Sequence, residues 1–268
     1  MKDKVVVITG SSGGIGESLA IKFASEKSRV VISARDSNKL DNVRKKLEAS
    51  GAEVLTVIGD VSREDDCKRL VDETIKRFGQ IDVLINNAGI SMRALFADVD
   101  LDVLRKVMDI NFWGTVYCTK NALPYLFKTK GSLVGISSIA GKKGLPGRTG
   151  YSASKFAMEG FLETIRTENL KKDLHVLVAC PGFTATDIRK NALSEKGEQQ
   201  HSSPRKEEKM MTSDEVANHI YKAIINRKRD LILTSNGKLT VWLNKFFPSL
   251  VDKLVFNHMA KEEDSPFK

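Results

Sequence analysis

Seven short runs of apolar residues, separated by longer amphipathic segments, constrain the fold of this chain most. The runs lie at residues 5–8, 30–32, 54–58, 83–85, 133–136, 176–179 and 231–233. Several are rich in Val and Ile and do not alternate with polar residues, which is typical of parallel strands covered on both faces. Between the runs, positions such as Leu40, Val43 and Leu47 repeat with helical spacing. The sequence therefore predicts an α/β fold, a doubly wound seven-stranded parallel sheet with helices on both faces.

The composition fits one soluble domain that spans residues 1–268. The chain is 41% apolar and 29% charged, which is too apolar for a disordered chain and too often interrupted by charge for a polytopic membrane protein. Residues 187–212 include the polar run 196–210 and are predicted to form a substrate loop or lid. Residues 237–268 are predicted to form an apolar helical segment and tail.

The charge and the cysteines say less about function. The formal net charge of +9 suggests an anionic partner without identifying one. Cys67, Cys118 and Cys180 are far apart and lack metal-ligand spacing, so we expect reduced thiols and no metal site. The first apolar run follows a four-residue start and is too short for a signal peptide, so a cytoplasmic location is expected.

A glycine-rich turn between the first strand and the first helix predicts a phosphate-binding loop. Gly10, Gly14 and Gly16 form a TGxxxGxG pattern, and an amphipathic segment follows at residues 17–23. Glycines allow the backbone to turn tightly and approach a pyrophosphate, which amide N–H groups at a helix start stabilise. This placement favours dinucleotide binding over a turn without function.

Further motifs follow this loop in a fixed order. They are NNAG at residues 86–89, Asn111, Ser138, YSASK at residues 151–155, and PGFTAT at residues 181–186. With them the chain resembles the short-chain dehydrogenase/reductase family over about residues 1–190. The resemblance implies a Rossmann-type sheet, a nicotinamide cofactor and hydride transfer.

Tyr151 and Lys155 are the candidate acid–base pair. Four positions apart on one helix, they lie on the same face, and a nearby ammonium favours the ionised form of a phenol. We therefore expect Tyr151 to exchange a proton with a carbonyl or alcohol oxygen. The resemblance implies that Lys155 binds the nicotinamide ribose, that Ser138 rather than Ser137 holds the same substrate oxygen, and that Asn111 holds a water behind the lysine.

The resemblance also implies the residues that contact the cofactor. They are Gly10, Ser12, Gly14, Ile15, Gly16, Arg35, Asp60, Val61, Asn87, Ala88, Gly89, Tyr151, Lys155, Pro181, Gly182, Thr184 and Thr186. Relatives that prefer NAD place a carboxylate where this chain has Ala34, and Arg35 follows. A guanidinium pairs well with a 2′-phosphate, so NADP(H) is favoured over NAD(H). Asp36 is an acidic neighbour that opposes this preference, and Ser11 and Ser12 offer no second basic group.

The substrate end is less clear. Apolar residues between positions 239 and 255 recur at helical spacing, interrupted by Pro248. They are expected to line a pocket for a lipid-like carbonyl, to pack in a homo-oligomer (a dimer or tetramer), or to contact a membrane surface beside Lys238, Lys245 and Lys253. The charged residues within this segment argue against a transmembrane helix.

Together these patterns predict an NADP(H)-dependent oxidoreductase that transfers a hydride between the cofactor and a carbonyl or secondary alcohol of a hydrophobic small molecule. One alternative is a 3-oxoacyl-[acyl-carrier-protein] reductase, whose acidic carrier a basic surface would attract. Another is a nucleotide-binding regulator without turnover, against which the set of Asn111, Ser138, Tyr151 and Lys155 argues. A nucleic-acid partner is not expected, because no aromatic-basic motif or recognition helix is evident.

Overall fold

A computed structural model describes residues 1–203, 210–262 and 265–267. The predicted loop at 187–212, its polar run 196–210 and the predicted tail therefore lie partly outside the described residues, at 204–209, 263–264 and 268. The described chain folds around a seven-stranded parallel sheet with helices on both faces, in the order β3-β2-β1-β4-β5-β6-β7. The predicted fold class is confirmed.

The strands closely match the apolar runs of the sequence. They are β1 (Val5–Thr9), β2 (Arg29–Ala34), β3 (Val54–Ile58), β4 (Val83–Asn86), β5 (Ser132–Ile136), β6 (His175–Cys180) and β7 (Asp230–Ile232). Only β7 is shifted along the sequence relative to its apolar run, since it begins at Asp230 and ends before Leu233. β1 lies inside the sheet, and its Val7 pairs with Val31 of β2 and with Leu84 of β4.

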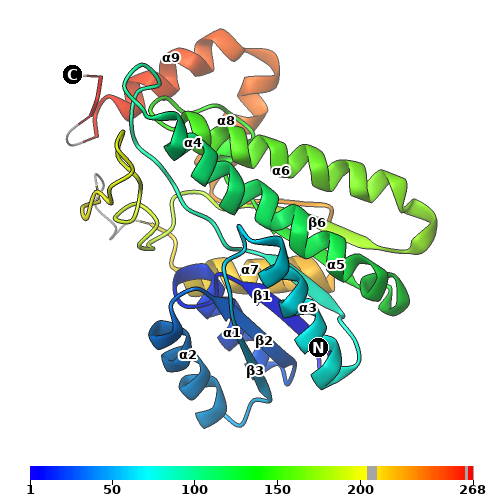
Figure 1. Cartoon of the computed structure of the whole chain (residues 1–268). Helices are drawn as coiled ribbons and strands as arrows, with labels where there is room; N and C mark the ends of the chain where they lie inside the picture. Colours follow the sequence, from blue (N-terminus) through cyan, green and yellow to red (C-terminus); the bar gives the residue numbers. More distant parts are fainter. Residues whose placement is uncertain (204–209, 263–264, 268) are drawn as a thin grey trace.

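Each face of the sheet is covered by three helices (Figure 1). One face carries α1 (Gly14–Ser25), α2 (Ser37–Ala49) and α7 (Ser213–Ile225); the other carries α3 (Glu64–Phe78), α5 (Gly114–Thr129) and α6 (Thr149–Glu168). A hydrophobic core lies on each face of the sheet. Alternate residues of β1 pack into one core or the other, because successive side chains of a strand point to opposite faces. Ile8 packs in the α1 core with Phe23, whereas Val7 packs in the α3 core with Leu70.

The strand order places a binding crevice at one edge of the sheet. β1 lies between β2 and β4, so the chain reverses its direction of winding there. In open α/β sheets ligands bind outside the carboxyl ends of the strands at such a reversal. The segments that follow β1, β4, β5 and β6 carry the predicted motifs, and they all meet at this edge.

The remaining helices lie beyond this edge. α4 (Leu101–Met108) continues through a π-helical turn, η1 (Asp109–Trp113), into α5, and α8 (Ser235–Phe246) is followed by α9 (Pro248–Met259). Figure 1 shows α8 and α9 at the end of the molecule beyond α4. Pro248 is the first residue of α9, so the predicted interruption is confirmed.

The large apolar side chains of α8 and α9 are mostly exposed. Trp242 is 55% exposed and Phe246 is 61% exposed, and Leu239, Leu250 and Leu254 are similar. The pocket interpretation is therefore wrong for these residues, and a subunit interface and a membrane surface are the two interpretations left. No helix in the described ranges is both long and apolar enough to span a bilayer.

Candidate active site

The glycine turn after β1 is packed too tightly for any other residue type at two positions. A Cβ built on Gly10, whose φ is +64°, would lie 2.7 Å from the Cα of Ala88. A Cβ on Gly16 would overlap the carbonyl oxygen of Gly10 and lie 2.5 Å from Nδ2 of Asn87. Gly16 thus brings α1 close to the strand end, and it lies outside the cavity lining, unlike the other glycines of the pattern.

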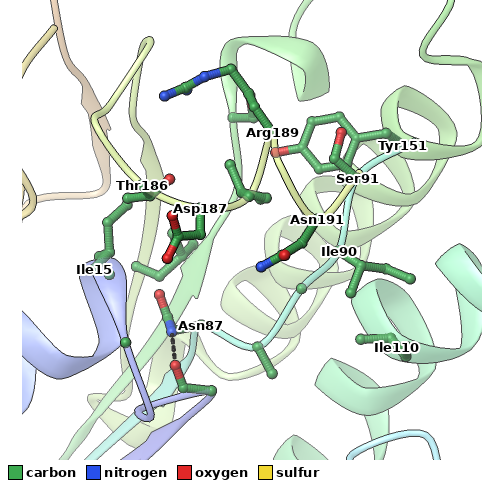
Figure 2. A pocket seen from close by; sticks show the side chains of 18 of the residues that line it. Ile15, Asn87, Ile90, Ser91, Ile110, Tyr151, Thr186, Asp187, Arg189 and Asn191 are labelled. Carbon is green, nitrogen blue, oxygen red and sulfur yellow. Dashed lines mark hydrogen bonds between the residues drawn. The ribbon is translucent and has the colours of Figure 1, made fainter. Parts of the chain in front are cut away.

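Asn87 and Thr9 fix the shape of this turn. Nδ2 of Asn87 donates hydrogen bonds to the carbonyl oxygens of Thr9 and Gly10, at 2.9 and 3.0 Å. Oγ1 of Thr9 in turn accepts from the backbone N–H groups of Asn87 and Ala88, at 3.1 Å each. Figure 2 shows Asn87 beside the cavity, on the same side as Ile15. The NNAG motif therefore braces the phosphate-binding turn from the neighbouring strand.

Basic side chains line the cavity at the end of β2. Arg35 is 56% exposed there, and its guanidinium lies 3.5 Å from the carboxylate of Asp60. The carboxylate of Asp36 caps α2 by accepting from the backbone N–H of Lys39, at 3.0 Å. Lys39 also lines the cavity. It is a basic residue that the sequence reasoning missed, although its place in the first turn after Arg35 could have indicated it.

The two serines of the glycine turn have different surroundings. Ser11 is fully buried, and its Oγ accepts a 2.8 Å hydrogen bond from the backbone N–H of Ser33 on β2. Ser12 lines the cavity. Ser11 therefore joins β1 to β2, and only Ser12 is placed to contact a ligand.

Ser138, Tyr151 and Lys155 line one cavity. Ser138 directly follows β5 and caps the short helix η2 (Ile139–Gly141), where its Oγ accepts from the N–H of Ala140 at 3.2 Å. Tyr151 lies in the first turn of α6 and Lys155 one turn later on the same face. The structure thus brings the predicted acid–base residues together.

Burial dominates the acidity of the phenol. It raises the pKa of Tyr151, whereas a hydrogen bond with Ser138 and the charge of Arg148 act in the opposite direction. Nζ of Lys155 lies 5.8 Å from the ring centroid and donates to the carbonyl oxygen of Ile136 at 2.8 Å. In the protein without cofactor, burial therefore outweighs the groups that lower the pKa of Tyr151. An influence of the Lys155 ammonium on the phenol stays a prediction.

Lys155 is itself buried. Removal from water lowers its pKa to about 8, and the negative charge of Glu159 opposes this shift. Glu159, one turn further along α6, accepts a 2.5 Å hydrogen bond from Ser137 and pairs with Lys142 at 2.6 Å. Both Ser137 and Ser138 line the cavity, but the hydroxyl of Ser137 is engaged by Glu159.

Asn111 lies outside the cavity lining and is fully buried in η1. Its Nδ2 donates to the carbonyl of Ile90 and to Oγ of Ser154, both at 2.9 Å, and its Oδ1 accepts from the N–H of Ile90 at 2.8 Å. These bonds use both amide hydrogens to hold the segment after the NNAG motif. The side chain of Asn111 thus braces this segment, and its role in holding a water stays a prediction.

The cavity has a volume of about 1000 Å³ and runs from the glycine turn to the substrate end. Figure 2 shows Tyr151 and Ser91 on one side, opposite Ile15 and Thr186. All the predicted cofactor residues except Gly16 line it. Lining residues that the sequence reasoning did not single out include Ile90, Ser91, Ile110, Leu145, Arg148, Ile188, Asn191, Leu193, Gln199, Met259 and Glu262. Several directly follow a recognised motif, which is the signal that could have identified them.

Comparisons with known proteins agree with this geometry. A family profile described as short chain dehydrogenase matches residues 4–197. The chain belongs to the short chain dehydrogenase family. It is accordingly an oxidoreductase that acts on CH–OH groups with a nicotinamide cofactor. The spacious cavity beside the tightly packed glycine turn fits such a dinucleotide.

Two relatives illustrate the range of similarity. The "Dehydrogenase/reductase SDR family protein 7-like" of Dictyostelium discoideum is 35% identical over 94% of this chain and 81% of its own length. The "11-beta-hydroxysteroid dehydrogenase 1A" of Arabidopsis thaliana is 42% identical over 69% of this chain. That match spans only 53% of the Arabidopsis protein, about half of its length.

Solved structures share the fold. A short chain dehydrogenase/reductase from Burkholderia phymatum in complex with NAD is 25% identical, with a TM-score of 0.84 over 93% of this chain and 95% of that one. An alcohol dehydrogenase from Thermococcus sibiricus complexed with 5-hydroxy-NADP is 24% identical, with a TM-score of 0.77 over 87% of this chain and 96% of that one. At this identity, the similarity to the Thermococcus enzyme shows a shared fold and carries no statement about activity or cofactor.

Proposed function

We propose that this protein is an NADP(H)-dependent oxidoreductase that interconverts a carbonyl and a secondary alcohol on a hydrophobic small molecule. The observation that carries the proposal is the single cavity, with the glycine turn at one end and Ser138, Tyr151 and Lys155 further along. In this arrangement a dinucleotide and a small substrate could bind side by side, next to the hydroxyl groups of Ser138 and Tyr151.

The protein residues supply the proton chemistry. When bound, a nicotinamide cofactor supplies or accepts the hydride. The raised pKa of Tyr151 keeps its phenol protonated, which suits donation of a proton to a carbonyl oxygen. Ser138 would hold that oxygen by a hydrogen bond, and Lys155 would place its ammonium beside the ribose. Asn111 would act through Ile90, by fixing the segment after β4 that lines the cavity.

The preference for NADP(H) rests on the charges at the end of β2. Arg35, Asp36 and Lys39 all line the cavity, and the carboxylate of Asp36 caps α2. A 2′-phosphate would pair with the two cations and would exchange with Asp60 as the partner of Arg35. One of the two solved structures contains NAD and the other contains an NADP derivative, so they do not decide the cofactor preference of this chain.

The substrate is proposed to be bulky and apolar. Ile90, Ile110, Leu145, Leu193 and Met259 lie along the cavity. Relatives from Arabidopsis, Sesamum indicum and Pinus massoniana are named 11-beta-hydroxysteroid dehydrogenases, and a fused-ring carbonyl of that kind is consistent with this apolar lining.

A screen of NADPH oxidation tests the proposal. The purified full chain would be assayed with steroid, aromatic, sugar and acyl-thioester carbonyls, with Tyr151→Phe as the inactive control. We expect turnover with apolar ketones that the control lacks. Preference for a 3-oxoacyl thioester on its carrier protein would instead identify the carrier-protein reductase, and no turnover with any class would refute the proposal.

A further inference from the structure

Glu159 of α6 holds both ends of the loop that carries Ser138. This serine loop consists of residues 137–142, which follow β5 and include η2. Oε1 of Glu159 accepts a 2.5 Å hydrogen bond from Oγ of Ser137, the first residue of the loop. Oε2 lies 2.6 Å from Nζ of Lys142, the last residue of the loop. One side chain thus ties the two ends of the serine loop to α6.

The same carboxylate also reaches the neighbouring strand. Sγ of Cys180, the last residue of β6, donates to Oε1 of Glu159 at 3.4 Å. Burial raises the pKa of this thiol well above its ordinary value, so it is a neutral donor. Glu159 is only 8% exposed, and a buried carboxylate requires such partners. Its partners come from the serine loop and from the end of β6.

The space around this carboxylate is closely filled. A Cβ built on Gly141, within the serine loop, would overlap Oε1 of Glu159 and lie 2.5 Å from Oγ of Ser137. The backbone of Gly141 therefore packs directly against the hydrogen bond between these two side chains. Packing as well as charge fixes the place of the loop relative to α6.

Glu159 shares its helix face with the two acid–base residues. Tyr151, Lys155 and Glu159 follow one another at intervals of four positions on α6, so they lie along one face. The phenol of Tyr151 shares a hydrogen bond with Ser138. The helix thus carries the phenol directly, whereas it holds the serine through Glu159. A shift of the serine loop would change the separation of these two hydroxyl groups.

We propose that Glu159 is a positioning residue, which holds the serine loop against α6 and thereby places the hydroxyl of Ser138 beside that of Tyr151. Glu159 lies outside the cavity lining, so it acts through Ser138 and does not touch the substrate. Its effect on turnover rests on the proposed function, whereas its hold on the loop does not.

Hydrogen exchange tests the hold on the loop without any substrate. In Glu159→Gln one carboxylate oxygen becomes an NH₂ group, which cannot accept, so one end of the loop loses its partner. Mass spectrometry would follow the amide N–H groups of residues 138–143 in the full chain. We expect their exchange to become about tenfold faster or more, because a hydrogen bond to a charged group is lost. Glu163→Gln, an exposed glutamate on the same helix, is the matched control and should leave the exchange unchanged. Equal exchange in Glu159→Gln and the natural protein overturns the inference.

A double variant tests whether Glu159 acts through Ser138. Misplacement of a reacting group by about 1 Å can cost on the order of 100-fold in rate, so kcat of Glu159→Gln should fall about 10- to 100-fold. The dissociation constant for NADPH should change less than about threefold, because Glu159 lies outside the cavity lining. In a Ser138→Ala background, the same change should lower kcat by less than about threefold, because the hydroxyl to be positioned is already absent. Losses that multiply in the double variant overturn the inference, since a general loss of structure would add to the loss of the serine.

Two glycine variants test the packing independently of charge. Gly141→Ala pushes a methyl group against Glu159 and Ser137, so it should raise loop exchange and lower kcat in the same way. Gly144→Ala has open space around its new methyl group and should change neither. Identical behaviour of the two variants overturns the inference. If Glu159→Gln does not fold, Lys142→Met takes its place, because it removes one end of the clamp at a partly exposed position.

The exchange measurement also separates this inference from the proposed function. If loop exchange rises in Glu159→Gln and the natural protein turns over no carbonyl, the hold on the loop stands and the proposed function fails. If carbonyls are turned over and loop exchange does not change, the function stands and the positioning role of Glu159 fails.

Discussion

Nζ of Lys155 donates its hydrogen bond to the backbone carbonyl of Ile136, at 2.8 Å, while it lies 5.8 Å from the ring centroid of Tyr151. The ammonium is thus tied to the end of β5, the strand that Ser138 follows. This bond fixes α6 against the sheet at the level of the reacting groups. The position of the phenol therefore depends on a strand end as well as on its own helix.

Replacement of Tyr151 by Phe should remove most turnover. The change deletes the hydroxyl that donates the proton, and general acid catalysis contributes roughly 10²- to 10⁴-fold to a rate. We expect kcat to fall by about that factor, while the dissociation constant for NADPH, measured by fluorescence titration, changes less than about threefold. Tyr125→Phe, on α5, is the matched control and should retain full activity. Undiminished turnover in Tyr151→Phe would contradict the acid role.

The stability of the protein should depend on the titration of Lys155. Its pKa of about 8 in the folded protein lies below the ordinary 10.5, so folding disfavours the charged form. The resulting penalty is fully present below pH 8 and disappears as the pH rises toward 10.5. Relative to Lys155→Met, the natural protein should therefore gain on the order of 3 kcal/mol of unfolding free energy across that interval.

Urea unfolding of both proteins at several pH values from 7 to 10.5 measures this difference. Other titrating groups are common to the two proteins and cancel in the comparison. Parallel curves would show that Lys155 is not destabilised by burial.

Loss of the Arg35 side chain should change the choice of cofactor. A hydrogen bond to a charged group contributes about 1.5–3 kcal/mol, so Arg35→Ala should weaken NADPH binding roughly tenfold or more. NADH, which lacks the 2′-phosphate, should be affected less than about threefold. Arg105→Ala, an exposed arginine on α4, controls for the change in net charge. Equal losses for the two cofactors would rule out the phosphate contact.

The glycine turn offers a matched pair of alanine substitutions. Gly16→Ala would force a methyl group onto the carbonyl oxygen of Gly10, and overpacking of this kind costs about 1–3 kcal/mol. Gly13→Ala has open space around its new methyl group and an extended φ of 174°, so it should change stability little. Thermal unfolding of both variants checks the difference, and equal melting temperatures would show that the close packing at Gly16 is relieved without cost.

Most of the fold could be predicted because parallel strands covered on both faces leave a clear pattern of buried Val and Ile. The predicted bounds of β7 were shifted by one residue, because the strand begins at the exposed Asp230, which an apolar pattern does not include. The π-helical turn around Asn111 could not be predicted, because its altered period spans only five residues. The direct bonds of the Asn111 amide were unpredictable for the same reason.

The sequence predicted the residues of the site correctly where a single local motif places them. Tyr151, Lys155 and Ser138 met at the cavity as expected. The burial that raises the pKa of Tyr151 could not be predicted, because it depends on contacts from several elements and no spacing rule reports it. Glu262 lies 3.6 Å from Arg93 and 3.7 Å from Arg148, and this meeting was equally unpredictable, since three positions far apart in the sequence converge only through the tertiary fold.

The packing of Pro266 and Phe267 against Gly147 has a consequence for the exchange of parts between related enzymes. The loop before Tyr151 and the segment after α9 form one contact surface, although more than 110 positions separate Gly147 from Ser265 in the chain. A chimaera that takes only one of them from a relative would bring together two surfaces that did not evolve together. Substrate range should therefore be transferable only when both are grafted as a unit.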